Sequence, residues 1–466
     1  MYVRRNANTK YLLYCYKMHG VISQIERRLD DGSSRGLATA VSRAARDGVL
    51  KPGQRLPPIR EVAHQLALSP TTVSAAWHLL ARAGTLRSDG RRGTFLADVA
   101  SPREGRYRQA LAQRTDFAID LSTGVPDARL LPRLNRALRH VTTAGTPQSY
   151  LDDPVLPELH DALVASWPYS PPALTVVDGA MDALELVIRT RLAFGDRVVV
   201  EHPTFPPLLD LLQAAGVETA GVRLDDEGII PSELAEALAS PARAVFLQPR
   251  AHNPTGISMT ARRARQLAVV LRRHDILVVE DDSAYAISLS PDATLAASLP
   301  ASTVHIRSFS KSYGPDLRLA AVSGPEDVIA AVRQLRELGQ GWSSRLLQHV
   351  LLNLLTDDAT SREIAAARVE YAHRRRVFVE TLTRQEVSVT GTDGLNIWVT
   401  VANEAAALMR LAAQGIAVAP GGPFKVLPDD DAHVRVTTGA VHENLEQVAR
   451  IVGEAARIGL GRAMAR

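Results

Sequence analysis

Short apolar runs and longer amphipathic patterns alternate along the chain beyond residue 117. The runs predict strands, because each is four to six residues long and bounded by turn-forming residues. The predicted strands cover residues 174–177, 197–200, 219–222, 244–248, 276–280, 304–309 and 319–323, and the helices between them include 184–192, 208–215, 232–239 and 260–273. This alternation predicts a multidomain α/β protein whose larger part is a mostly parallel seven-stranded sheet covered by helices. Ligand-binding side chains are then expected at the carboxyl ends of the strands.

The first hundred residues follow the helical period instead. Helices are predicted from Leu37 to Gly48, over residues 59–66, and over residues 71–83, where Ser69 is a good N-cap followed by Pro70. The third helix has an apolar face and an opposite polar face, formed respectively by Val73, Ala76, Trp77 and Leu80, and by Thr71, Thr72, Ser74 and His78. Segments 85–87 and 94–96 then predict a hairpin with arginines at its tip.

These patterns divide the chain into four parts. Residues 1–19 form a tail without the features of a signal peptide, and translation could begin at Met1 or at Met18. Residues 20–97 form the small helical domain, and the polar, aperiodic residues 98–116 are a linker. Residues 117–466 form the larger domain, with a large part at about 150–340 and a smaller α+β part at about 370–466.

Charge and cysteine content narrow the functional classes. The first hundred residues hold 16 Lys and Arg against 7 Asp and Glu, while the rest hold 38 against 43. A basic front end suggests contact with a polyanion. The single cysteine, Cys15, excludes an internal disulfide and a cysteine zinc site, and we predict no metal site. No run approaches 18 apolar residues, so we expect no membrane span and a cytoplasmic protein.

One lysine, Lys311, lies between the two predicted strands 304–309 and 319–323. As a single lysine it could simply be exposed in a loop. The alternative is that Lys311 bonds an aldehyde cofactor whose phosphate is held by Ser308, Ser310 and Arg318. Such an amine must be neutral, and we expect the charge of Arg318 to lower its pKa.

Other polar signals follow the predicted strands. The amides of Gly179, Ala180 and Met181 open a helix and could hold a phosphate. Asn253 begins Asn-Pro-Thr-Gly, 28 residues before Asp281. A carboxylate beneath a pyridine nitrogen would keep that nitrogen protonated, and both Asp281 and the adjacent Asp282 are candidates.

The stretch from Ser308 to Leu319 resembles the lysine signature of fold-type I aminotransferases, which use pyridoxal 5'-phosphate. The resemblance implies that Lys311 forms a Schiff base with this cofactor and that the Asn253 spacing selects Asp281. It assigns further residues to the cofactor or its ligand: Phe205 stacks on the ring, Tyr285 contacts the phenolic oxygen, Tyr150 reaches the neighbouring subunit's phosphate, Gly124 covers the substrate, and Arg435 binds its carboxylate.

Three residues depart from the family pattern. Met181 stands where glutamine is common, Asp178 adds a negative charge beside the expected phosphate, and Tyr285 is displaced by its offset. These departures indicate impaired turnover.

The first hundred residues resemble the GntR-type winged helix-turn-helix in three motifs, namely the segment from Gly48 to Ala63, Ser-Pro-Thr-Thr-Val and Gly-Thr-Phe. The third helix of this fold enters the major groove and the wing touches backbone or minor groove. The resemblance assigns DNA contacts to Arg60, Ser69, Thr71, Thr72, Ser74, Arg91, Arg92 and Gly93.

Together the two parts resemble the MocR family of transcriptional regulators. The resemblance implies double-stranded DNA as a partner, a head-to-tail homodimer, and an amino compound or pyridoxal phosphate itself as effector. Three hypotheses stay open: a regulator that senses through its cofactor, a working aminotransferase that carries a DNA-binding domain, and a structural body without cofactor.

Overall fold

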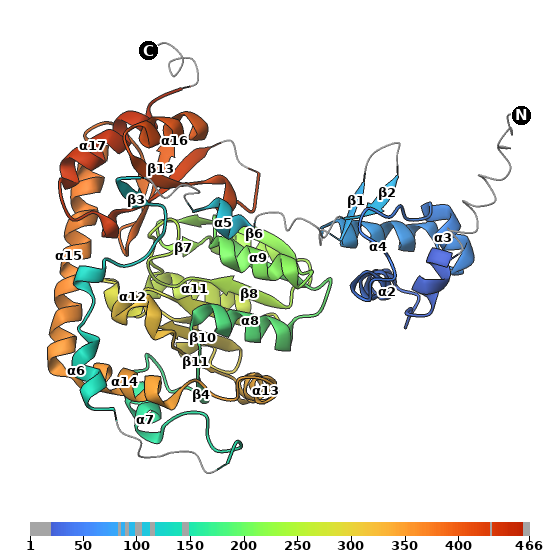
Figure 1. Ribbon diagram of the computed structural model, residues 1–466, viewed down its shortest axis with the longest axis horizontal. Helices are drawn as coiled ribbons and strands as arrows, with labels where there is room; N and C mark the ends of the chain where they lie inside the picture. The colour runs from blue at the N-terminus through green and yellow to red at the C-terminus, as the bar shows by residue number, and fades with distance from the viewer. Residues whose placement is uncertain are drawn as a thin grey trace, which may run out of the picture. The chain divides into compact units, whose positions relative to one another are not determined.

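The computed structural model describes residues 20–82, 85–88, 93–97, 105–111, 117–141, 149–428 and 431–459 (Figure 1). Contacts within the chain define two compact units, with the main division between Arg103 and Glu104. The first unit is largely the small N-terminal domain, and the second holds most of the remaining chain. No helix within the described ranges is both long and apolar enough to cross a membrane.

The N-terminal domain is a winged helix. A helix over residues 20–26 precedes α2 (Ser34–Arg46), α3 (Ile59–Gln65) and α4 (Pro70–Arg82), and the wing is formed by β1 (Leu86–Ser88) and β2 (Thr94–Leu96). The predicted apolar face of the third helix is buried, since Val73, Ala76 and Leu80 are fully enclosed and Trp77 nearly so. The two wing strands pair antiparallel, with Leu86 opposite Leu96. The predicted helix–helix–helix–hairpin order is therefore confirmed.

The second unit is built on an eight-stranded sheet in the order β4-β11-β10-β9-β8-β5-β6-β7. The strands are β4 (Ala173–Val177), β5 (Arg197–His202), β6 (Glu218–Asp225), β7 (Gly228–Ile229), β8 (Ala244–Leu247), β9 (Leu277–Asp282), β10 (Thr303–Ser308) and β11 (Ala320–Gly324). The central pairs β10/β9, β9/β8 and β8/β5 are parallel, and β11 runs antiparallel to both its neighbours. The prediction of seven strands was wrong by one, because the two-residue β7 is too short to show a periodic pattern.

Helices surround this sheet (Figure 1). They are α6 (Leu134–Arg139), α7 (Pro157–Ala165), α8 (Ala180–Arg191), α9 (Pro206–Ala214), α10 (Pro231–Ala237), α11 (Ala261–Leu271), α12 (Ser310–Tyr313), α13 (Glu326–Glu337) and α14 (Arg345–Thr356). Strands β4 and β8 are buried on both faces, which explains why their sequences are almost continuously apolar.

A second sheet forms the small part, in the order β12-β13-β15-β14-β3. Its C-terminal strands are β12 (Val389–Thr390), β13 (Asn396–Val401), β14 (Ile416–Pro420) and β15 (Ala432–Thr437), and its helices are α15 (Asp358–Thr383), α16 (Glu404–Ala413) and α17 (Leu445–Ala456). The remaining strand, β3 (Ile119–Leu121), comes from far earlier in the sequence and pairs parallel with β14. The segment after β3 is therefore brought to the large sheet from the small one.

The expected linker contains an ordered helix. Within residues 98–116 the structure describes 105–111, which form α5 (Arg106–Gln109) and group with the second unit. The backbone N–H groups of Arg106 and Tyr107 each donate to the Asp210 carboxylate, at 2.9 Å. Residues 105–111 are thus part of the second unit rather than free linker.

A buried arginine fastens the Asn-Pro-Thr-Gly loop to the small sheet. Both terminal nitrogens of Arg375, on α15, donate to backbone carbonyls in the turn before β13, those of Gly391, Asp393, Gly394 and Asn396. In turn the N–H groups of Thr392 and Asp393 each donate to the Gly256 carbonyl, at 3.0 Å. Gly256 has φ +72°, and a Cβ there would lie 2.9 Å from the Arg375 guanidinium, so the turn requires glycine.

Arg375→Ala should lower the free energy of unfolding by about 3 kcal/mol, because it leaves several buried carbonyls without donors. Urea denaturation followed by tryptophan fluorescence measures this change. Arg376→Ala is the matched control, since the Arg376 side chain is 66% exposed, and we expect it to stay within about 0.5 kcal/mol of wild type. Equal unfolding midpoints for the two variants would contradict a stabilising role for Arg375.

Candidate functional site

A cavity of about 370 Å³ contains most of the predicted chemistry. Its volume falls within the range of small-molecule sites. Its walls come from the large sheet, from the small part and from the segment before β3, and they include Tyr107, Leu111, Thr123, Gly124, Met181, Phe205, Gln248, Asn253, Ser283, Lys311, Arg318, Phe424 and Arg435. The structure thus brings together residues from eight separate stretches of sequence.

Lys311 lies on α12, one turn beyond the end of β10, and projects into this cavity. Enclosure by the cavity walls lowers the pKa of its amine, and the nearby charge of Arg435 lowers it further, while the Asp281 carboxylate acts in the opposite direction. The positive charge that lowers the pKa of Lys311 is therefore that of Arg435, and our expectation that Arg318 would have this effect was wrong. A lowered pKa favours the neutral amine that can bond a carbonyl.

Asp281 is the penultimate residue of β9, and two residues that line the cavity hold its side chain. The Gln248 side-chain amide donates to one carboxylate oxygen at 2.7 Å, and the Ser283 hydroxyl donates to the other at 2.5 Å. Burial raises the pKa of this carboxyl, although both hydrogen bonds oppose the shift.

The Asp282 side chain pairs with another residue and is not among the described residues that line the cavity. It is completely buried and forms an ion pair with Arg250, and its carboxylate also accepts the Tyr285 backbone N–H at 3.1 Å. Of the two candidate carboxylates, Asp281 is the one beside the cavity.

The expected phosphate end lies where α8 begins. Gly179 has φ +104°, and its Cα faces the Arg318 guanidinium, about 3.6 Å from where a Cβ would stand. Met181 and Arg318 both line the cavity. Ser308 and Ser310 are close behind, with the Ser310 N–H donating to the Ser308 hydroxyl at 3.4 Å, but neither is among the described cavity-lining residues.

The unfavourable charge of Asp178 is neutralised. Arg336 donates to the Asp178 carboxylate at 3.1 Å and to that of Asp182 at 2.6 Å. Asp178 is therefore paired with an arginine on α13.

Arg435 forms the opposite end of the cavity. It lies on β15, and its guanidinium donates to the Asn253 side-chain oxygen at 3.1 Å and to the Ser122 carbonyl. Burial lowers its pKa to about 10, and its Nε has no partner among the described residues. Gly124 is adjacent, because its N–H donates to Thr437 at 3.0 Å and a Cβ on it would lie 3.3 Å from Arg435.

Tyr285 and Tyr150, both predicted to contact the cofactor, are also not among the described residues that line the cavity. Tyr285 packs edge-on against Phe309, with the Arg307 guanidinium 4.2 Å from its ring centroid. Its ring thus packs among Phe309 and Arg307 and not on the described wall of the cavity. Tyr150 is 89% exposed and stacks on Trp342.

The sequence analysis missed several cavity residues, among them Gln248, Tyr107 and Phe424. Gln248 bonds both Asp281 and the Asn253 backbone N–H, and its place directly after β8 could have revealed it. Tyr107 lies in the expected linker, where nothing in the pattern pointed to a site. Phe424, in a short turn, lies under Arg435 with the guanidinium 5.2 Å from its ring centroid.

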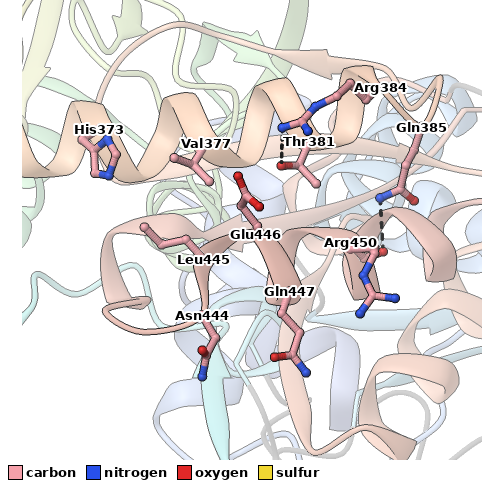
Figure 2. Close-up of a pocket in the computed structure, with 10 residues that line it drawn as sticks. All are labelled: His373, Val377, Thr381, Arg384, Gln385, Asn444, Leu445, Glu446, Gln447 and Arg450. Carbon is pink, nitrogen blue, oxygen red and sulfur yellow. Dashed lines mark hydrogen bonds between the residues drawn. The ribbon is translucent and has the colours of Figure 1, made fainter.

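A larger groove, of about 830 Å³, runs between α15 and α17 (Figure 2). Figure 2 shows Arg384 bonded to Thr381, and Gln385 bonded to the Arg450 carbonyl. None of the predicted residues is among the described residues that line it. Size alone therefore does not identify the site, and the smaller cavity around Lys311 is the stronger candidate.

Four of the predicted DNA-contacting residues, Ser69, Thr71, Thr72 and Ser74, lie at or near the start of α4. The Ser69 hydroxyl accepts the Thr72 N–H at 3.0 Å and lies 2.6 Å from the Thr71 hydroxyl. Ser69, Thr71 and Arg60 are exposed, Thr72 and Ser74 partly so. Gly93, at the base of the wing, has φ +103°, while Arg91 and Arg92 lie outside the described residues.

Comparison with known proteins gives the same two-part division. Residues 34–96 match the family of bacterial regulatory proteins of the gntR type, and residues 118–452 match aminotransferase class I and II. The chain is 36% identical to the vitamin B6 salvage pathway transcriptional repressor PtsJ of Salmonella typhimurium, over 85% of this chain and 92% of that protein. It is 29% identical to the pyridoxine biosynthesis transcriptional regulator PdxR of Corynebacterium glutamicum, over 74% and 78%.

Among solved structures, the fold is similar to that of the kynurenine aminotransferase of Pyrococcus horikoshii. The TM-score is 0.67 at 23% identity, and the match covers 74% of this chain and 91% of that one. This likeness supports the fold of the second unit.

Asp281→Asn should stabilise the ligand-free protein at neutral pH. Because burial raises the pKa of Asp281, the stability it contributes in acid is lost as the pH rises through its folded-state pKa. Asparagine removes the buried charge and can keep one hydrogen bond, so we expect a gain on the order of 1 kcal/mol at pH 7 that disappears near pH 4. Denaturant titrations at the two pH values measure this.

The control is Asp161→Asn, at a side chain that is 86% exposed, where we expect no difference between the two pH values. The same substitution at Asp281 should weaken binding of pyridoxal phosphate about tenfold or more, because a neutral amide does not favour a protonated ring nitrogen. Destabilisation at pH 7 combined with unchanged cofactor affinity would contradict the assignment of Asp281.

Proposed function

Because the chain belongs to the MocR-type family of transcriptional regulators, with a gntR-type domain followed by an aminotransferase class I and II domain, we propose that it regulates transcription in response to a small amino compound. The DNA-binding domain contacts double-stranded DNA, and the aminotransferase-like domain holds pyridoxal phosphate. The effector binds at the cofactor. We place this activity in the cytoplasm, where the DNA is.

The observation that carries this proposal is the position of Lys311. Its amine lies in an enclosed cavity with Asn253 and Arg435, in the same chain as a gntR-type domain. A lysine exposed in a surface loop would not have its pKa lowered by burial.

The residues present fit pyridoxal phosphate. Gly179, Arg318 and the N-terminus of the twelve-residue helix α8 offer positive charge and N–H groups for the phosphate. Phe205 lines the cavity where a ring can stack, and Asp281 supplies a carboxylate for the ring nitrogen. When bound, this cofactor supplies an electrophilic aldehyde and an electron-withdrawing ring.

The chain's own residues select the effector. Lys311 presents a neutral amine, so an incoming primary amine competes with it for the same position. Arg435 keeps one nitrogen, Nε, without a described partner, and it suits a carboxylate on the effector. We therefore favour an amine that also carries an acidic group, with pyridoxal phosphate alone as the other candidate.

We also propose that the protein works as a homodimer, arranged head-to-tail. Tyr150 is 89% exposed and its ring stacks on Trp342, and the adjacent Leu151 is 81% exposed. Exposed apolar residues gathered in this way mark an interface. In such a dimer Tyr150 reaches the partner's cavity rather than its own.

Catalytic turnover is the second candidate function, because Lys311, Asn253 and Arg435 share one cavity. Against it, Met181 lines that cavity in place of glutamine, and Tyr285 points elsewhere. Repeated transamination of a common amino donor, followed over many turnovers, would favour the enzyme over the regulator.

Arg60→Ala should weaken DNA binding about tenfold at moderate salt, because arginine dominates contacts with phosphate and guanine. The cofactor absorbance should be unchanged. Fluorescence anisotropy with a duplex selected from a random pool measures the affinity. Arg27→Ala, at an exposed arginine outside α3 and α4, is the control. Unchanged affinity for every duplex in the Arg60 variant would refute the assigned groove-facing surface.

Lys311→Ala should abolish the visible absorbance of bound pyridoxal phosphate, because no other described cavity residue offers an amine. DNA binding should persist without its response to the cofactor. Spectrophotometric titration and anisotropy measure the two effects. Lys51→Ala, in the other unit, should keep the absorbance. A wild-type protein without such absorbance would instead support a structural body that has lost its cofactor.

A further inference from the structure

Helix α5 lies on the chain between the DNA-binding domain and the cavity, and it contributes to the cavity wall. Tyr107 and Leu111 line the cavity, and Ala110 is 97% buried against Trp398 and Phe424. Only residues 98–104 separate Gly105 from Ala97, the last described residue of the wing region. The segment of chain that leads from the DNA-binding domain to the second unit therefore forms part of the cavity wall.

The docking of α5 depends on a few specific contacts. The Arg106 guanidinium donates to the carbonyls of Lys425 and Pro423, at 2.8 and 3.2 Å, and Asp210 accepts the two N–H groups at the start of the helix. A helix of four residues has almost no stability of its own in water. Its docked state therefore exists because of these contacts, and small changes in them shift its population.

The turn to which α5 is tied also borders the ligand. This turn, η6 (Gly422–Phe424), places Phe424 under Arg435, and the Phe424 carbonyl accepts the Thr204 N–H at 2.9 Å, next to Phe205. Tyr107 and Arg435 line the same cavity. A ligand bound at Arg435 would thus lie beside both α5 and the turn η6 to which α5 is bonded.

We propose that Tyr107 and Leu111 are effector-contacting residues, and that an acidic amine seated at Arg435 stabilises the docked form of α5 and so transmits occupancy of the cavity to the DNA-binding domain. This inference rests on the proposed function. A ligand that contacts the helix only when it is docked shifts the equilibrium toward that form by its differential affinity. The two-state element is α5, docked or released.

The first test is hydrogen exchange over residues 105–111 in the full chain. The probe is N-(5'-phosphopyridoxyl)-L-alanine, a stable conjugate that fills the cofactor position and directs a carboxylate to Arg435. We expect it to slow exchange of these amides about tenfold or more, and pyridoxal phosphate alone to slow it less. Bound conjugate with unchanged exchange would overturn the inference.

The second test distinguishes the loss of a direct contact with the ligand from a general folding defect. Tyr107→Ala should weaken binding of the conjugate about fivefold or more and leave the affinity for pyridoxal phosphate unchanged. Tyr107→Phe should reduce the affinity for the conjugate by a smaller factor. Leu138→Ala, which truncates another exposed apolar side chain, is the matched control. Equal affinities in Tyr107→Ala and wild type would also overturn the inference.

The third test concerns transmission. Arg106→Ala should speed exchange at 105–111 without ligand, and DNA affinity should no longer respond to the conjugate. Asp210→Asn removes a different anchor and should act in the same direction, which guards against a folding defect in one variant. A wild-type DNA response that survives both substitutions would refute transmission through α5.

These outcomes distinguish the two proposals. If the wild-type protein binds neither pyridoxal phosphate nor the conjugate, the proposed function fails and the inference fails with it. If it binds both and α5 shows no response, only the inference is lost.

Discussion

The site depends on a partly buried lysine amine that lines a cavity. Lys311 stands just beyond the carboxyl end of β10, beside the end of the parallel strand β9 with Asp281. Burial makes charge costly for both groups, lowering one pKa and raising the other, while their mutual attraction opposes both shifts. The positive field of Arg435 adds to the effect on the lysine. The cavity thereby favours a neutral nucleophile beside a carboxyl group that gains most from a positively charged partner.

That environment requires distant parts of the chain to meet. Arg435 belongs to the small sheet, Asn253 follows a strand of the large one, and their side chains are 3.1 Å apart. Gly124 belongs to a third segment, which follows β3, and β3 is held in the small sheet by its pairing with β14. Arg375 holds the turn before β13, and the N–H groups of that turn bond the Gly256 carbonyl of the Asn253 loop. A change in the packing of any of these pieces therefore alters the charge balance around Lys311.

The same assembly explains how a catalytic fold can serve regulation. The cavity keeps Lys311, Asn253 and Arg435, the groups that we propose for binding a cofactor and an acidic ligand, while Met181 stands in its wall where glutamine is common. One wall of the cavity is α5, whose sequence position leads directly to the DNA-binding domain. In our proposal, a ligand that contacts Tyr107 can therefore shift the conformation of this segment. Such a shift has no evident role in an enzyme that lacks a DNA-binding domain.

Local sequence determined the winged helix, the strand–helix alternation and the residues at strand ends, because each depends on periodicity or on a motif within about twenty residues. Lys311, Asn253 and Asp281 were accessible in this way. Tertiary structure decided what periodicity does not encode: that Asp281 rather than Asp282 borders the cavity, that Arg435 rather than Arg318 shifts the lysine, and that a helix in the expected linker completes the wall. In each case the deciding contact joins residues far apart in the chain, or separates neighbours onto opposite sides of a strand, and such relations exist only once the fold has formed.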